Sequence, residues 1–219
     1  MKLRRTLSAL TFPTDTAYRD LPVEWAKGVA VQILGWMWLS FDRLKANHLA
    51  GVDIGQPIDQ LERGLTFHHF IDLQVLVREQ TEGFSSLIPV HECEEFESLS
   101  SGGARPPSYD FGFVHVEHRR WIWPIEAKVL PTPGLLHDYL GDVRNKFESG
   151  VAAPLVGEGG MIAYLLSGST DAVFLNLQEH LASRLETVHE YEGRPHRTSF
   201  HMRSTAPALR LHHMVMVCY

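Results

Sequence analysis

Residues 109–130, YDFGFVHVEHRRWIWPIEAKVL, decide the fold of this chain. Two apolar runs, Tyr109–Glu117 and Trp121–Leu130, are predicted as strands, and the three polar residues between them give the spacing of a β-hairpin. Side chains alternate between the two faces of a strand, so Glu126 and Lys128 share one face of the second strand. Both faces of that strand are largely apolar, which indicates that layers cover it on both sides. We therefore expect an α/β domain built around this hairpin.

The hairpin also predicts a cluster of charged side chains. Asp110 opens the first strand, and an antiparallel pair brings the start of one strand close to the end of the other. Asp110 is therefore expected near Glu126 and Lys128. Charged groups in apolar surroundings are costly unless they are paired or bind an ion. For an isolated Glu-x-Lys, a structural ion pair or the solvated face of an edge strand is the alternative interpretation. Two converging carboxylates beside a lysine form a hard-oxygen site suited to Mg²⁺.

This segment resembles the PD-(D/E)XK, or restriction-endonuclease-like, nuclease superfamily. The residues that carry the resemblance are Asp110 at a strand start, Glu126-Ala127-Lys128 inside an apolar strand, and Pro106-Pro107 just upstream. The chain departs from the pattern where Tyr109, in place of proline, directly precedes Asp110. The order of the predicted elements extends the likeness from Ile58 to Leu181.

The resemblance implies a mixed central sheet flanked by helices. It also implies a nuclease-like domain at residues 58–219, preceded by a helical extension at residues 1–57. The hydrophobic and turn patterns predict the other elements. These are helices at Pro22–Leu49, Ile58–Glu79, Leu135–Ser149 and Asp171–Val188, strands at Phe84–Val90, Met161–Leu166 and Leu209–Val217, a loop at Ser98–Ser108, a glycine turn at Gly157–Gly160, and a polar loop before the last strand.

The resemblance further implies hydrolysis of phosphodiester bonds without a covalent intermediate. Asp110 and Glu126 would hold Mg²⁺, or Mn²⁺ in its place, with the Ala127 carbonyl and Glu62 on the preceding helix completing the ion's shell. Lys128 would position or deprotonate the attacking water, or offset the charge that builds on phosphorus. We expect an endonuclease acting on DNA, in restriction, repair or phage defence.

The negative net charge of the chain bears on how it could bind nucleic acid. The net charge is −6 and the sequence pI about 6.1, whereas affinity for phosphates comes largely from Lys and Arg. We expect local contacts from Arg119, Arg120, Arg144 and Lys146, with ordinary solvated residues as the alternative. We also expect a homo-oligomer or a subunit of a larger complex.

The two cysteines lack metal-type spacing, which indicates buried thiols in a reducing cytoplasm. The apolar stretch Val29–Phe41 is too short to cross a bilayer, so no membrane partner is expected.

Two other functions remain open at this point. The chain could be a nuclease-like fold that acts as a binding or scaffold subunit without turnover, a possibility that its negative charge and apolar N-terminal helix raise. It could instead be a hydrolase with histidine-bound zinc or iron, because the sequence holds 13 histidines. No pair of them has the spacing of a helical zinc site, so hydrogen-bonded structural histidines or surface histidines are favoured.

Overall fold

The computed structural model describes residues 16–81, 85–95 and 106–219. Within these ranges seven strands form one mixed sheet in the order β1-β2-β3-β4-β7-β6-β5. The strands are β1 (Leu87–Glu94), β2 (Ser108–His115), β3 (Ile122–Leu130), β4 (Glu158–Leu165), β5 (Glu186–Thr187), β6 (His196–His201) and β7 (Leu209–Val217). The helical segments are α2 (Thr16–Asn47), α3 (Ile58–Gln80), α4 (His137–Asp142), the π-helical η2 (Val143–Glu148), α5 (Thr170–His180) and the 3₁₀ turns η1 (Leu49–Gly51) and η3 (His189–Tyr191).

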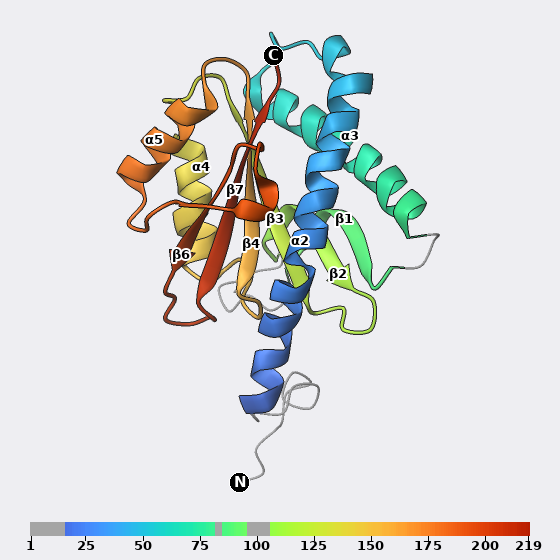
Figure 1. The fold of residues 1–219 in the computed structure, drawn as a ribbon, viewed down its shortest axis with the longest axis vertical. Coiled ribbons are helices and arrows are strands. Elements are labelled where there is room, and N and C mark those ends of the chain that lie inside the picture. Colours follow the sequence, from blue (N-terminus) through green and yellow to red (C-terminus); the bar gives the residue numbers. More distant parts are fainter. Residues whose placement is uncertain (1–15, 82–84, 96–105) are drawn as a thin grey trace.

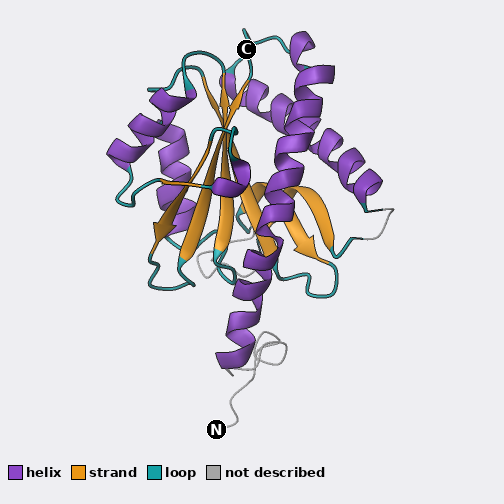
Figure 2. Cartoon of the chain, in the orientation of Figure 1, coloured by secondary structure: helices purple, strands orange, loops and turns teal. Residues whose placement is uncertain are grey.

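The central strands are parallel and the outer strands antiparallel. β4 pairs in parallel with β3 and β7, whereas β1–β2–β3 on one side and β7–β6–β5 on the other are antiparallel. Helices α2 and α3 cover one face of the sheet, and α4 and α5 cover the other (Figure 1, Figure 2). The chain is thus an α/β protein with a mixed sheet flanked by helices, as the sequence predicts.

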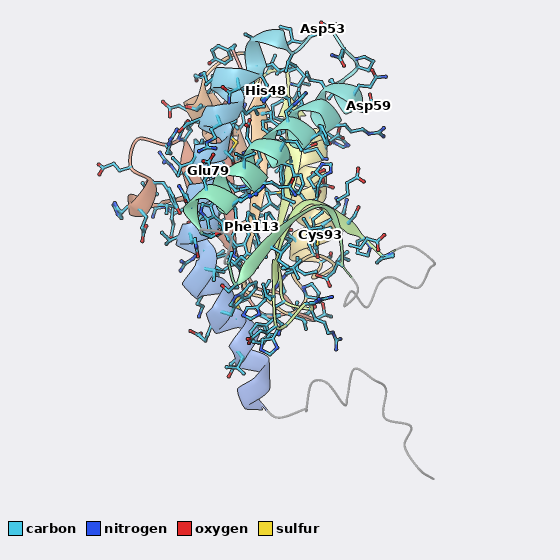
Figure 3. All side chains as sticks on the ribbon, turned by 90° about the vertical axis from the view of Figure 1, so that its right-hand side faces the viewer. His48, Asp53, Asp59, Glu79, Cys93 and Phe113 are labelled. Atoms are coloured by element: carbon cyan, nitrogen blue, oxygen red, sulfur yellow. The ribbon has the colours of Figure 1, made fainter. Side chains whose placement is uncertain are left out.

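Helices α2 and α3 cross each other on one face of the sheet. Figure 3 shows α3 running from Asp59, near its start, to Glu79, near its end, obliquely to α2. Trp36 of α2 stacks on Phe113 of β2, with ring centroids 6.2 Å apart. The middle of α2 is buried in the same apolar core as the sheet. No helix in the described ranges has both the length and the apolar character needed to span a membrane.

Several predicted boundaries are confirmed closely. The last strand has the predicted bounds, and the second helix begins at Ile58 as predicted and ends one residue later than expected. The hairpin strands and the helical segment over residues 137–148 are also present. Phe84 and residues 98–105 of the predicted loop lie outside the described residues.

The prediction of buried thiols is confirmed, because Cys93 and Cys218 are buried and free and burial raises the pKa of each thiol to about 12.

Three predictions are wrong. The glycine turn at Gly157–Gly160 is largely part of β4, where a Cβ on Gly159 would come within 2.8 Å of a ring atom of Phe147. These glycines therefore allow close packing within a buried strand. The helix predicted at Asp171–Val188 ends at His180, and the stretch predicted as a polar loop contains β6. β6 has polar residues that face inward, so it lacks the apolar alternation by which strands are identified.

Candidate active site

The pairing between β2 and β3 stops where the candidate acidic residues begin. The last paired residues on this side are Phe111 and Ile125. Beyond them the Asp110 carboxylate takes the place of a backbone acceptor, because the Ala127 N–H donates to Asp110 Oδ2 at 2.7 Å. The start of β2 therefore meets the end of β3 through a side chain, which confirms that Asp110 lies beside the Glu126-Ala127-Lys128 segment.

This arrangement also orients the Ala127 carbonyl. The N–H and C=O of one strand residue point toward the same neighbouring strand. The N–H of Ala127 points toward Asp110, so its carbonyl points to that side as well. Leu130 points its backbone groups to the other side of β3, since its carbonyl accepts a hydrogen bond from the N–H of Leu166, just after β4. The Ala127 carbonyl is thus directed to the side where the β2 backbone pairing has ended.

Glu62 of α3 completes the edge of β3 beyond Asp110. Its Oε2 accepts a hydrogen bond from the Val129 N–H at 3.2 Å, and its Oε1 accepts one from Lys128 Nζ at 2.8 Å. Glu62 therefore satisfies a strand N–H where β2 provides no partner and holds the Lys128 ammonium at the same time.

Two side chains from α4 and η2 approach the cluster. Lys146 Nζ lies 2.8 Å from Glu126 Oε1, and Asp142 Oδ2 lies 3.3 Å from Lys128 Nζ and 3.5 Å from Lys146 Nζ. Asp142 and Lys146 are four residues apart, a spacing that brings side chains together on a helix. Lys146 was predicted as a contact to nucleic acid, and Asp142 was not among the predicted site residues. Their i, i+4 spacing beside the hairpin was the signal that could have identified them.

The cluster contains more negative than positive charge. Four carboxylates, those of Glu62, Asp110, Glu126 and Asp142, surround the two ammonium groups of Lys128 and Lys146. With all of them ionised, two negative charges are uncompensated.

The pKa values of the cluster reflect this imbalance. Glu126 is only 2% exposed, and burial, with the charge of Asp110 next in size, raises the pKa of its carboxyl well above the ordinary value. Burial also raises the pKa of Glu62, although its hydrogen bond with Lys128 opposes the shift. Burial alone would lower the pKa of Lys128, but the hydrogen bond and charge of Glu62, followed by the charges of Asp142 and Asp110, raise it above its usual range. Lys128 therefore keeps its proton, whereas Glu126 ionises less readily than an ordinary glutamate despite its contact with Lys146.

The oxygen atoms of this cluster suit a divalent cation. Glu126 Oε1 and Asp142 Oδ2 are buried and accept no well-directed hydrogen bond; the neighbouring ammonium groups contact them as ion pairs. In the described residues, no three Asp, Glu, His or Cys side chains are arranged as a metal-binding group. A Mg²⁺ site needs fewer, because the ion keeps several waters and takes one or two carboxylates. Asp110, Glu126 and the Ala127 carbonyl are the residues that would hold it.

The predicted nucleic-acid contacts are not all near this cluster. Arg119 and Arg120 lie at the hairpin turn, and Arg120 is six residues from Glu126, about 20 Å along the strand. Arg144 is exposed on η2 and donates to the carbonyl of His180 at 3.1 Å. Of the four predicted residues, the structure brings only Lys146 into the cluster.

The buried histidines form two directional chains of hydrogen bonds. On the α2 face, the Trp38 N–H can only donate, so it fixes the direction of the whole chain. It donates to His196 Nδ1 at 3.4 Å, His196 Nε2 then donates to His212 Nδ1 at 3.1 Å, and His212 Nε2 donates to Glu158 Oε2 at 3.0 Å. Both ring nitrogens of each histidine are satisfied.

The second chain lies on the α4 face and ends at Glu148. Its carboxylate, 3.0 Å from His201 Nδ1, fixes that nitrogen as the donor, and Ser199 Oγ donates to His201 Nε2 at 2.6 Å. Ser199 in turn accepts from His213 Nε2 at 2.7 Å, and the Tyr139 hydroxyl donates to His213 Nδ1 at 2.8 Å. The prediction of structural, hydrogen-bonded histidines is confirmed for these residues, and the chains explain how β6 buries polar side chains.

A third buried histidine site, His69, gives a testable dependence of stability on pH. Its ring bonds Tyr164 Oη, Met37 O and Ser40 Oγ, and burial lowers its pKa to about 4. An unfolded histidine binds a proton below about pH 6.5, whereas the folded protein excludes it until about pH 4, so this group destabilises the fold as the pH falls through that window. The stability lost on replacing His69 by Gln is expected to be about 2 kcal/mol smaller at pH 5 than at pH 7.5, measured by urea unfolding. An unchanged difference would show that the ring is not neutral and buried.

Comparisons of the chain with protein-family models, with curated proteins and with solved structures each found no match.

Proposed function

We propose that this chain is a Mg²⁺-dependent nuclease of the restriction-endonuclease-like type, which hydrolyses phosphodiester bonds in nucleic acid, with DNA as the first substrate to test. The observation that carries the proposal is the cluster around Glu126. There, the Asp110 and Glu126 carboxylates come from adjoining strands that also carry Ala127 and Lys128, and with every group of the cluster ionised two negative charges are uncompensated. A divalent cation would supply the missing charge.

Each residue has a role that follows from its contacts. A divalent ion bound by Asp110, Glu126 and the Ala127 carbonyl supplies the positive charge that polarises a phosphate and lowers the pKa of a water. Lys128, held by Glu62 and Asp142, keeps its proton because its pKa is raised. Lys128 is therefore suited to stabilising the charge that develops on the phosphate, and it is poorly suited to removing a proton from water.

The experiment that tests the proposal is a cleavage assay on supercoiled plasmid, linear duplex DNA, single-stranded DNA and RNA. We expect cleavage with Mg²⁺ or Mn²⁺ and none with EDTA. Intact substrates with every metal, together with no Mn²⁺ binding in calorimetry, would contradict the proposal and favour the scaffold alternative.

Replacing Lys128 by Met is expected to slow cleavage by about 10²–10³-fold, because one preorganised cation beside the phosphate is lost. The measurement is the rate of plasmid nicking at saturating Mg²⁺, with Lys45→Met on α2 as the matched control because Lys45 is exposed near the end of that helix. Equal rates for the Lys128 variant and the unmodified protein would remove Lys128 from the site.

A further inference from the structure

Lys146 contacts the same carboxylate that the proposed function assigns to a metal ion. Its ammonium lies 2.8 Å from Glu126 Oε1, and Glu126 is 2% exposed. Lys128, the lysine of the sequence motif, does not make this contact; its ammonium lies against Glu62 and Asp142. Lys146 is therefore the cation that directly contacts the Glu126 carboxylate.

A metal ion at Glu126 Oε1 and the Lys146 ammonium at the same oxygen would repel each other. Mg²⁺ binds carboxylate oxygens at about 2.0–2.1 Å, and an ammonium beside the same oxygen would face a divalent cation at short range. Two like charges a few ångströms apart in partly buried surroundings repel by several kcal/mol at an effective dielectric constant of about 20. Binding of a metal ion at Glu126 Oε1 would therefore favour movement of the ammonium away from that oxygen.

The structure offers Lys146 a second partner. Asp142 lies one helical turn earlier, with Oδ2 3.5 Å from Lys146 Nζ. The Lys146 side chain is 29% exposed, so it has room to move away from Glu126 while its backbone stays in place. The backbone here is π-helical over Val143–Glu148, and π-helical turns occur frequently at functional sites.

We propose that Lys146 competes with the divalent cation: its ammonium contacts the Glu126 oxygen that the ion would take, and it moves toward Asp142 when the ion binds. This inference rests on the proposed function, since it takes Asp110 and Glu126 as the metal ligands. The affinity of the site for a metal ion would then depend on how readily the ion displaces the Lys146 ammonium from Glu126.

Calorimetric titration with Mn²⁺, in the absence of nucleic acid, tests the competition directly. Lys146→Met keeps the length of the side chain and removes the charge, so Mn²⁺ is expected to bind about tenfold more tightly or better. Lys146→Arg retains a cation and should bind Mn²⁺ much as the unmodified protein does. Arg144→Met, on the exposed side of the same segment, is the matched control and should leave the affinity unchanged.

The outcomes separate this inference from the proposed function. Equal or weaker Mn²⁺ binding by Lys146→Met, with clear binding by the unmodified protein, overturns the competition and leaves the nuclease proposal standing. If the unmodified protein and all three variants bind no Mn²⁺, the proposed function itself is contradicted, and the competition with it.

A second measurement needs no variant and so does not depend on the stability of Lys146→Met. The unmodified protein is acetylated briefly with and without Mn²⁺, and each lysine is followed by mass spectrometry. Mn²⁺ is expected to increase acetylation of Lys146 at least about threefold relative to Lys45, because the amine leaves a buried ion pair for a more exposed position. Unchanged or reduced acetylation of Lys146, at Mn²⁺ concentrations where calorimetry shows binding, overturns the inference.

Discussion

Replacing Glu126 by Gln is expected to reduce metal-dependent cleavage by at least about a thousandfold while leaving the protein folded and no less stable. The amide has nearly the shape of the carboxylate but carries no negative charge, so it binds a divalent ion far more weakly. Burial and the charge of Asp110 raise the pKa of Glu126, so its ionised form destabilises the metal-free fold, and Gln removes that cost. Loss of activity without loss of stability is the pattern expected where a site has been optimised for function.

Two measurements check this result. Cleavage rates give the first, and the thermal unfolding midpoint with and without Mn²⁺ gives the second. A ligand that binds only the folded state raises the midpoint, so Mn²⁺ should raise it for the unmodified protein and not for Glu126→Gln.

Glu158→Gln is a suitable control because Glu158 is an equally buried glutamate, at 2% exposed, on the neighbouring strand β4. Its Oε2 accepts a hydrogen bond from His212 Nε2, and it takes no part in the Glu126 cluster. This control should keep full cleavage and the full response to Mn²⁺. If Glu126→Gln cleaves as fast as the unmodified protein, the reaction takes place elsewhere on the chain.

The core of the candidate site could be predicted because it depends on local sequence. An antiparallel hairpin fixes which residues face each other, so the proximity of Asp110 to Glu126 and Lys128 follows from the two strands and the short turn between them. Glu62 was expected only from the resemblance to the nuclease superfamily, as part of the ion's shell, and in the structure its carboxylate contacts Lys128. These residues come from three elements whose order along the chain was readable from hydrophobic patterns.

The second half of the site could not be predicted in the same way. Asp142 and Lys146 reach Glu126 and Lys128 only because α4 and η2 pack on one face of β3, and no local pattern specifies that packing. Lys146 was therefore interpreted as a surface contact to phosphate. The structure gives its ammonium a place against the most buried carboxylate of the cluster.

The errors in secondary structure have a common cause. Gly159 and Gly160 resemble a turn in sequence, yet their missing side chains make room for Phe147 and Trp123 against β4. β6 resembles a polar loop, yet Ser199 and its histidine neighbours bury their polar atoms in one hydrogen-bonded chain. In both places tertiary contacts, which a linear pattern does not contain, decide the local structure.

Replacing Arg203 by Met is expected to destabilise the fold by about 3–5 kcal/mol, the largest effect on stability that we predict. Arg203 is 8% exposed, and in the described residues no carboxylate forms an ion pair with its guanidinium. Instead it donates to backbone carbonyls of η2, of the segment between η2 and β4, and of the turn before β7. These acceptors are Phe147, Ala152, Ala153, Val156 and Pro207, at distances between 2.6 and 3.4 Å.

The size of this effect comes from the carbonyls left behind. Burial lowers the pKa of Arg203 to about 10, so the guanidinium remains charged and strengthens each of its bonds. Met would fill similar space but leave buried acceptors unpaired, at a cost of about 1–3 kcal/mol for each that finds no water. Ala153, held by one of these bonds, has a φ of 52°, a conformation that persists only when its surroundings fix it.

Thermal unfolding and urea titration measure this effect, with Arg210→Met as the control. Arg210 is exposed on β7, and its replacement is expected to change the free energy of unfolding by no more than about 0.5 kcal/mol. Arg203→Lys should fall between the two, because an ammonium keeps the charge but has three donors in place of five. If Arg203→Met unfolds within about 1 kcal/mol of the unmodified protein, water replaces the guanidinium at these carbonyls. The segment around Lys146 would then be held by its other contacts, such as the buried Phe147 ring and the hydrogen bond from the Ala153 N–H to Tyr109 Oη.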